Sequence, residues 1–313
     1  MIITLTPNPS VDRTLVVSRL KFNEILRAEP ALLDWGGKGL LASRGLKELG
    51  QPSLVLGFVG GGAGKMLEDG LTKLNIQSDF VWVDGETRSN TVVQEESNDW
   101  YMLVNEPGPR VTPENIDDIF IKASKYANPG DIWLVAGSLP PGVPEDFFAR
   151  LIRMLKAKGV RVVFDAISAP LKLGVQEVPW MLYPEVAEAE RLVGFEILNF
   201  DMAKRAAMNF LQQGIENVAI ILEKGGLLLS SRSLMVMASP LKVPVVRVTG
   251  GRSALCAGLL DGFAKGLPLV EIARYAMAFR GAYVSNKDFY SGGPVDFQDL
   301  IHMVEIRAIP ISQ

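Results

Sequence analysis

The chain of 313 residues contains one cysteine, Cys256, and one histidine, His302. A single cysteine excludes an internal disulfide and a multi-cysteine metal site, so we expect a reducing, cytoplasmic setting. One histidine near the C-terminus also disfavours a Ser/His/Asp triad and a multi-histidine metal centre. Because Cys256 lies in an apolar helical pattern, we expect a small buried side chain there.

Long apolar runs and an excess of basic residues are also missing. No stretch approaches the roughly 20 apolar residues of a membrane span, and residues 2–5 follow Met1 without a leader-like segment. The formal net charge is −3 and no long Lys/Arg run is visible. Nucleic acid and membranes are therefore disfavoured as partners, and any anion must be bound locally.

What is present is a regular alternation of strand-like and helical patterns. Apolar, β-branched runs cover residues 2–6, 54–59, 132–136, 160–165 and 218–222, with helical patterns between most of them. This order predicts an α/β fold in which helices cover both faces of a mostly parallel sheet. Ligands of such folds bind at the carboxyl ends of the strands.

Two segments interrupt that alternation, residues 10–35 and 79–108. Both contain extended patterns joined by short loops, which favours antiparallel strands that leave the main sheet and form a small β-lid. No repeat, low-complexity tract or linker divides the chain. We therefore expect residues 1–313 to form one domain with a lid.

An apolar run over residues 245–249 ends at Gly250-Gly251, and a helical pattern of small residues follows. The pattern predicts a strand, a tight turn and a buried helix N-terminus. Unpaired backbone N–H groups and the helix dipole attract phosphate to such a turn, and Arg252 adds a cation. An ordinary strand–helix corner, whose glycines serve only packing, fits the same residues.

A second glycine motif, Gly36-Gly37-Lys38-Gly39, precedes the helical pattern of residues 40–49. Glycines let the backbone approach a ligand closely, and the Lys38 ammonium can neutralise a charge on it. The spacing differs from that of a P-loop.

In their order and spacing these motifs resemble the ribokinase-like PfkB sugar kinases, and within them the 1-phosphofructokinase and tagatose-6-phosphate kinase group. The resemblance covers essentially the whole chain. The motifs on which it rests are residues 6–12 (Thr-Pro-Asn-Pro-Ser-Val-Asp), 36–39 (Gly-Gly-Lys-Gly), 87–90 (Thr-Arg-Ser-Asn), 105–109 (Asn-Glu-Pro-Gly-Pro), 137–142 (Gly-Ser-Leu-Pro-Pro-Gly) and the corner at 250–253.

The resemblance implies a three-layer αβα fold, a lid that often serves as a homodimer clasp, and transfer of the ATP γ-phosphoryl group to a sugar phosphate with Mg²⁺. The residues it implies for the sugar phosphate are Asp12, Arg27, Gly37, Lys38, Arg88, Asn90 and Asn105. An arginine fork suits phosphate, and Asp12 matches the residue that holds sugar hydroxyls. Taken alone, Asp12 is also typical of a turn, and Arg27 and Arg88 are also typical of a solvent-exposed lid surface.

At the nucleotide end the resemblance implies a second set of residues. They are Glu185, Glu188, Leu222, Glu223, Gly225 and Asn286, with Glu188 also acting indirectly on the metal ion. Closure of the lid over both ligands would exclude water.

The chain departs from the family pattern at the corner. Where the family has Gly-Ala-Gly-Asp, this chain has Gly250-Gly251-Arg252-Ser253. The family's Asp takes the proton of the attacking hydroxyl, whereas the Ser253 hydroxyl cannot accept a proton at neutral pH. Arg252 also replaces a glycine that lets the backbone wrap the phosphate.

Further departures lie nearby. Leu41 and Glu185 each stand where the family has an asparagine, and residues 221–225 (Ile-Leu-Glu-Lys-Gly) replace a Ser-Leu-Gly beside the nucleotide. Two interpretations follow: a sugar-phosphate kinase that is slow or impaired, or a catalytically inactive pseudokinase that binds a sugar phosphate or a nucleotide and regulates. A structural subunit that pairs through its lid is a third.

Overall fold

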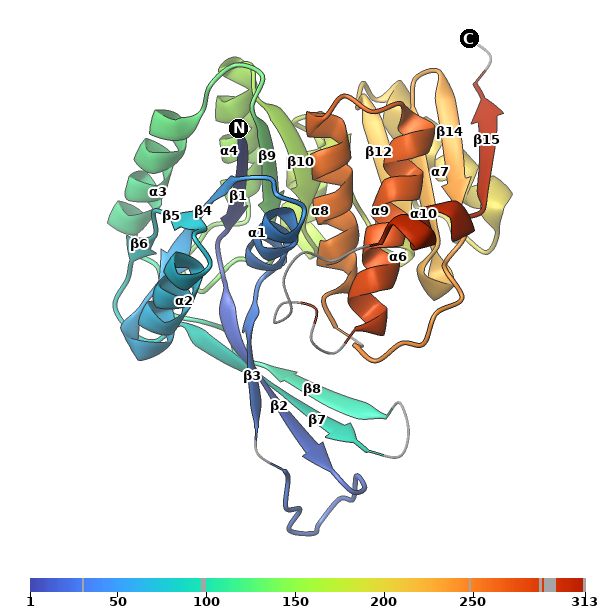
Figure 1. Ribbon diagram of the computed structural model, residues 1–313. Coiled ribbons are helices and arrows are strands. Elements are labelled where there is room, and N and C mark those ends of the chain that lie inside the picture. Colours follow the sequence, from blue (N-terminus) through green and yellow to red (C-terminus); the bar gives the residue numbers. More distant parts are fainter. Residues whose placement is uncertain (30, 97–99, 248, 287–288, 290–296, 312–313) are drawn as a thin grey trace.

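The computed structural model describes residues 1–29, 31–96, 100–247, 249–286, 289 and 297–311 (Figure 1). Its main sheet consists of β1 (Ile2–Thr6), β4 (Ser53–Val59), β5 (Gln77–Ser78), β6 (Val81–Trp82), β9 (Ile132–Ala136), β10 (Arg161–Asp165), β11 (Met181–Leu182), β12 (Asn217–Ile221), β13 (Leu227–Ser231), β14 (Leu234–Ala238) and β15 (Ile306–Pro310). The order is β15-β14-β13-β12-β11-β10-β9-β1-β4-β5, with β6 beside β4. From β5 to β12 neighbours run parallel, and from β12 to β15 antiparallel. The predicted mostly parallel sheet is confirmed.

Helices cover both faces of this sheet (Figure 1). They are α1 (Lys38–Glu48), α2 (Gly61–Lys73), α3 (Pro113–Tyr126), α4 (Phe147–Ala157), α5 (Ser168–Val175), α6 (Val186–Val193), α7 (Phe200–Gln212), the 3₁₀ turn η1 (Glu223–Gly225), α8 (Gly251–Ala264), α9 (Leu269–Ser285) and α10 (Gln298–Met303). Successive side chains of a strand point to opposite faces. Accordingly Ile3 and Leu5 of β1 belong to the core cluster that includes residues of α3, α4 and α7, whereas Ile2 belongs to the cluster that includes residues of α1, α8 and α9. The three-layer αβα fold is therefore confirmed.

A separate sheet forms the lid, which extends from one side of the main body (Figure 1). Its strands are β2 (Ser10–Val17), β3 (Leu32–Gly36), β7 (Arg88–Glu95) and β8 (Tyr101–Asn105), in the order β3-β2-β7-β8. We expected antiparallel pairing throughout, but β2 and β7 run parallel. The lid is also shorter than predicted, because Val81 is buried in the main core and its strand β6 pairs with β4.

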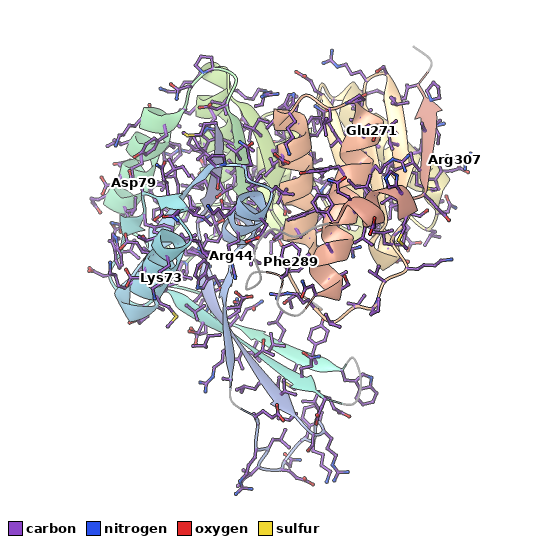
Figure 2. All side chains as sticks on the ribbon, in the orientation of Figure 1. Arg44, Lys73, Asp79, Glu271, Phe289 and Arg307 are labelled. Atoms are coloured by element: carbon purple, nitrogen blue, oxygen red, sulfur yellow. The ribbon has the colours of Figure 1, made fainter. Side chains whose placement is uncertain are left out.

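Charged side chains attach the lid to the main body. Asp34 of β3 forms ion pairs with Arg44 of α1 and with Arg247, the latter at 3.1 Å. The Arg44 guanidinium also lies 4.5 Å from the centre of the Trp35 ring. Figure 2 shows Arg44 near the junction of lid and body.

Two local predictions were wrong. The Gly-Gly-Gly sequence of residues 60–62 predicts a flexible turn, but α2 already begins at Gly61 because the Glu86 carboxylate accepts hydrogen bonds from the N–H groups of Gly62 and Ala63 (2.8 and 3.0 Å). Residues 245–247 of the strand expected over 245–249 have no regular structure. The Val245 side chain there is 61% exposed, and residue 248 lies outside the described residues.

The glycine corner itself has the predicted form. Gly250 precedes α8 with a φ of 80°, in the left-handed region that favours glycine. A Cβ atom there would lie 2.0 Å from the Tyr283 hydroxyl, so no other residue fits. Among the described residues, none of the helices combines the length and the apolar character that crossing a membrane requires.

Candidate active site

Polar residues of the lid base form a compact hydrogen-bonded cluster, which we call the Asp12 cluster (Ser10, Asp12 and Asn90). The register of β2 against β7 places Asp12 beside Asn90. Asp12 Oδ1 accepts hydrogen bonds from Ser10 Oγ at 2.7 Å and from Asn90 Nδ2 at 2.8 Å. The Asn90 amide oxygen is buried and has no hydrogen-bond partner among the described residues.

Burial raises the pKa of Asp12, and this effect outweighs the hydrogen bonds from Ser10 and Asn90 and the attraction of Arg88. A partly desolvated carboxylate and an unpartnered amide oxygen are both hydrogen-bond acceptors. Hydroxyl groups are matching donors, so the Asp12 cluster suits a sugar.

A cavity of about 500 Å³ lies next to Arg88 and Ser138. Arg88 Nε donates to the Asn8 carbonyl oxygen at 3.2 Å, and Nη1 donates to the Glu106 carbonyl oxygen at 3.3 Å. The carboxylates of Asp12 and Glu106 attract this guanidinium, but none of the ion pairs among the described residues includes Arg88. Burial lowers the pKa of Arg88. A half-buried guanidinium without a carboxylate partner favours an anion such as phosphate. Ser138 was not among the candidate residues predicted from the sequence, although its place two residues after the end of β9 was a signal.

The other residues assigned to the sugar phosphate lie in different places. Gly37 precedes α1 with a φ of 107°, and Lys38 reaches Asp165 Oδ1 with Nζ at 2.8 Å. Asn105 lies opposite Asn90 in the β7–β8 ladder. Arg27 lies on the exposed loop between β2 and β3, which Figure 1 places at the end of the lid farthest from the main sheet. The structure does not bring Arg27 to the cleft of its own chain.

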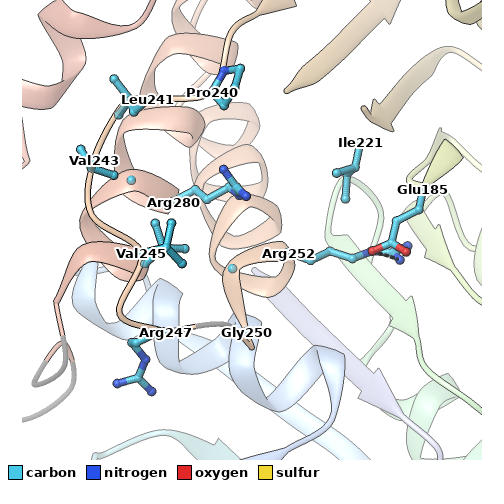
Figure 3. A pocket seen from close by; sticks show the side chains of 13 residues that line it. Glu185, Ile221, Pro240, Leu241, Val243, Val245, Arg247, Gly250, Arg252 and Arg280 are labelled. Atoms are coloured by element: carbon cyan, nitrogen blue, oxygen red, sulfur yellow. Dashed lines mark ion pairs between the residues drawn. The ribbon is translucent and has the colours of Figure 1, made fainter. Parts of the chain in front are cut away.

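Arg252 crosses the cleft toward the carboxyl ends of the parallel strands (Figure 3). Its Nη2 atom donates to Asp165 Oδ1 and, at 3.0 Å, to the Tyr183 carbonyl oxygen. Its Nη1 atom lies 3.0 Å from Glu185 Oε1 and 3.9 Å from Glu188 Oε2. We call Arg252 with Asp165, Glu185 and Glu188 the Arg252 cluster. Burial alone would lower the pKa of Arg252, but the attraction of the negative groups around it outweighs burial and raises it.

Asp165 is the functional candidate that sequence analysis missed. It is buried at the end of β10, and its Oδ1 atom binds both Lys38 and Arg252. The available signal was a carboxylate at the carboxyl end of a predicted parallel strand, where ligands of such folds bind. Asp165 therefore joins Lys38 of α1 to Arg252 of α8.

Ser253 follows in the first turn of α8 and is only 6% exposed. The one histidine of the chain, His302, lies on α10 and is far from Ser253 in sequence. The expectation that Ser253 occupies the position of a general base stays a prediction.

A second cavity, of about 400 Å³, adjoins the corner and is lined by Glu185, Gly250, Gly251, Arg252 and Arg280 (Figure 3). Leu222 precedes η1, which contains Glu223 and Gly225. Gly225 lies against Arg280, because a Cβ atom there would be 2.3 Å from Arg280 Nη2. Asn286 directly follows α9 and is exposed.

Glu188, which sequence analysis connected with Mg²⁺, and its neighbour Glu185 do not fit a divalent ion as they stand. Mg²⁺ needs free oxygen ligands in nearly octahedral geometry. Glu185 and Glu188 face Arg252, and the Glu188 carboxylate also accepts the Glu185 N–H at 2.9 Å. Within the described residues no group of three or more His, Cys, Asp or Glu side chains is arranged to hold a metal ion.

Comparison with known proteins gives matches over nearly the whole chain. Residues 8–291 match the family model described as pfkB family carbohydrate kinase. The chain is 31% identical to 1-phosphofructokinase of Haemophilus influenzae, with 92% of each chain covered. It is 30% identical to 1-phosphofructokinase of Bacillus subtilis, covering 99% of this chain and 100% of the relative. Phosphofructokinase-2 of Escherichia coli shares the fold, with a TM-score of 0.90 at 23% identity over 96% of this chain and 98% of the other. The chain therefore belongs to the pfkB family of carbohydrate kinases.

Proposed function

We propose that this chain binds a phosphorylated ketose, with fructose 1-phosphate as the first candidate, and transfers a phosphoryl group from ATP to it slowly. The observation that carries the proposal is the Asp12 cluster next to Arg88, which offers hydroxyl acceptors beside a half-buried guanidinium that has no ion pair among the described residues. The relatives named 1-phosphofructokinase support the choice of sugar.

The chemistry explains why transfer is expected to be slow. The attacking hydroxyl must lose its proton, and a serine at the base position cannot take it. The buried Asp165 carboxylate already binds Lys38 and Arg252 through Oδ1. A general base contributes roughly 10²- to 10⁴-fold. Because phosphoryl transfer depends largely on positioning and charge neutralisation, a slow reaction survives this loss.

In this arrangement the glycine corner and its cations would receive the nucleotide. The α8 N-terminus at Gly251 presents backbone N–H groups, and Arg252 and Arg280 line the adjoining cavity. ATP is the proposed donor, and ADP would leave from the same cavity.

A second candidate function is a non-catalytic binding protein that senses a phosphorylated sugar or nucleotide. The Arg252 cluster favours it, because the Arg252 guanidinium at the cavity beside the glycine corner is already paired with carboxylates of the chain. Such a protein would use the old kinase cleft for recognition alone.

Calorimetric titration with fructose 1-phosphate, tagatose 6-phosphate, fructose 6-phosphate and ATP separates the two functions. Binding of both a ketose phosphate and ATP, with slow formation of ADP, supports the kinase. Binding of a ketose phosphate without ATP, or of ATP without a ketose phosphate, supports the sensor, and binding of none of the four ligands contradicts both. Arg88→Gln is the matched variant: it should weaken sugar-phosphate binding and leave ATP binding unchanged.

A further inference from the structure

The contacts of Arg252 to carboxylates have no evident use in binding a phosphate group. Three carboxylates from two parts of the sheet edge converge on its guanidinium: Asp165 at the end of β10, and Glu185 and Glu188 at the start of α6. The Arg252 side chain is 16% exposed, Asp165 4% and Glu188 9%, whereas Glu185 is 49% exposed. The buried charges of Arg252, Asp165 and Glu188 must be paired.

The geometry points to a specific role: we propose that Arg252 is a resident cation that takes the place of a divalent metal ion in the Arg252 cluster and excludes one from it. This inference concerns the chain's own residues, and it holds whether or not a sugar phosphate binds.

Contacts on both sides of the guanidinium support the proposal. Nη1 faces Glu185 and Glu188, and Nη2 faces Asp165, so one planar group engages carboxylates in two directions. A carbonyl oxygen, that of Tyr183, completes the set at 3.0 Å. Carboxylate and carbonyl oxygens are the ligands that hard divalent cations take.

The backbone holds Arg252 in this position. The Tyr183 hydroxyl donates to the Arg252 carbonyl oxygen at 2.8 Å, while Arg252 Nη2 donates to the Tyr183 carbonyl oxygen. The guanidinium carbon also lies 5.5 Å from the centre of the Tyr183 ring. Both ends of the arginine are thus fixed to one residue of the sheet edge.

Charge balance gives the reason for exclusion. Together with Lys38, the Arg252 cluster combines three negative and two positive charges, which leaves a single negative charge. A divalent ion would have to enter beside a guanidinium that is already bound to the same oxygens, and like charges repel strongly at such short range. The ion can bind only after Arg252 has left.

The test is binding of Mn²⁺, measured by the electron paramagnetic resonance signal of free Mn²⁺, to the full-length chain and to Arg252→Ala. We expect no stoichiometric binding to the unaltered chain at millimolar Mn²⁺. Arg252→Ala should bind one ion per chain at least about ten-fold more tightly. It should also melt at a lower temperature than the unaltered chain in EDTA and recover when Mn²⁺ is added.

Controls assign the ion to this cluster. Arg280→Ala removes another arginine from the same cavity and should gain no Mn²⁺ site. Asp165→Asn, added to Arg252→Ala, should weaken the new site. If Arg252→Ala does not fold, Arg252→Gln, which keeps most of the length without the charge, replaces it.

Two results would overturn the proposal. One is stoichiometric Mn²⁺ binding to the unaltered chain that Glu188→Gln abolishes. The other is a folded, uncharged variant at position 252 that gains no Mn²⁺ site. Neither result affects the sugar-phosphate titration, so the proposed function fails or holds separately.

Discussion

Arg252 and Ser253 are consecutive residues in the first turn of α8, and their side chains have opposite environments. The Arg252 guanidinium reaches across the cleft to carboxylates, while the Ser253 side chain is buried and uncharged. If Ser253 replaces a general base and Arg252 a glycine, the two positions should be tested together.

Arg252→Gly combined with Ser253→Asp should raise phosphotransfer from ATP to fructose 1-phosphate. The expected gain is roughly 10²- to 10⁴-fold, because an aspartate can accept the hydroxyl proton. The rate of ADP formation in the presence of Mg²⁺ measures it. Arg252→Gly with Ser253→Asn is the control, since it supplies a similar shape without a carboxylate. An equal rate for both double variants would show that the base is not what limits this chain.

Asp12 is expected to make ketose-phosphate binding depend on pH. Its ionised form accepts hydroxyl hydrogen bonds, so Asp12→Asn should weaken ketose-phosphate binding roughly ten- to hundred-fold, from about 1.5–3 kcal/mol for a bond to a charged group. Because burial raises the pKa of Asp12, binding should weaken on acidification at a higher pH than for an ordinary aspartate. Titrations at a series of pH values measure both effects.

The stability of the fold should respond to Asp12 in the opposite direction. A carboxyl group whose pKa is raised in the folded state binds its proton more tightly there than in the unfolded chain, so its contribution to stability rises as pH falls. In Asp12→Asn both dependences should disappear. If sugar binding keeps the same pH dependence in this variant, a titratable group other than Asp12 causes that dependence.

At the residue scale, local motifs pointed to residues that the fold brings together at the base of the lid, but they did not point to Asp165. Asp12, Arg88 and Asn90 fall within short motifs, and strand register brings Asp12 and Asn90 together. Asp165 belongs to no such motif. Its role depends on Lys38 and Arg252, which lie 127 and 87 residues away in the chain and meet it only in the folded protein.

Helices α8 and α9 are the elements that position the glycine corner. Their packing leaves no room at Gly258, where a Cβ atom would lie 2.6 Å from Ala276 Cα. A buried polar contact also joins them: Asp261 Oδ2 of α8 accepts hydrogen bonds from the Tyr275 hydroxyl of α9 and from Lys265 Nζ, both at 2.6 Å.

Tyr275→Phe should lower the free energy of unfolding by about 1–3 kcal/mol, because the buried Asp261 carboxylate loses a donor. Urea unfolding followed by circular dichroism measures the change. Tyr126→Phe is a suitable control, since its hydroxyl also donates to an aspartate, Asp79, but at a less buried site. Equal small effects of both substitutions would argue against the contact's importance to the α8–α9 pair.

Element by element, hydrophobic periodicity predicted most of the main sheet, and long-range contacts decided where it failed. The Glu86 carboxylate, distant in sequence, turns the glycine run at 60–62 into the start of α2. Val245 and Val246 carry a strand-like pattern, yet the N–H of Val246 donates to the Val284 carbonyl oxygen of α9 instead of a strand. Periodicity contains no information on either partner.

On the scale of the whole molecule, the lid carries a group of exposed apolar side chains. All five residues of β8 are exposed, so apolar side chains such as Met102 and Leu103 face solvent on both sides of the strand. Next to them, a cavity of about 560 Å³ is lined by Leu20, Lys21, Phe22, Leu26, Val93, Trp100, Tyr101 and Met102. Exposed apolar patches of this kind mark interaction surfaces.

We therefore predict a homodimer that pairs through the lids, in which Arg27 at the lid tip meets the partner chain instead of its own cleft. Met102→Asp should weaken dimerisation at least about ten-fold, equivalent to about 1.4 kcal/mol, because a charge would be buried without a partner. Light scattering over a range of protein concentrations measures the mass. Met66→Asp is the matched control: Met66 on α2 is 44% exposed and Met102 40%, but Met66 lies outside the lid. A single-chain mass for the unaltered protein at every concentration, or an equal loss in both variants, would rule out the lid as the interface.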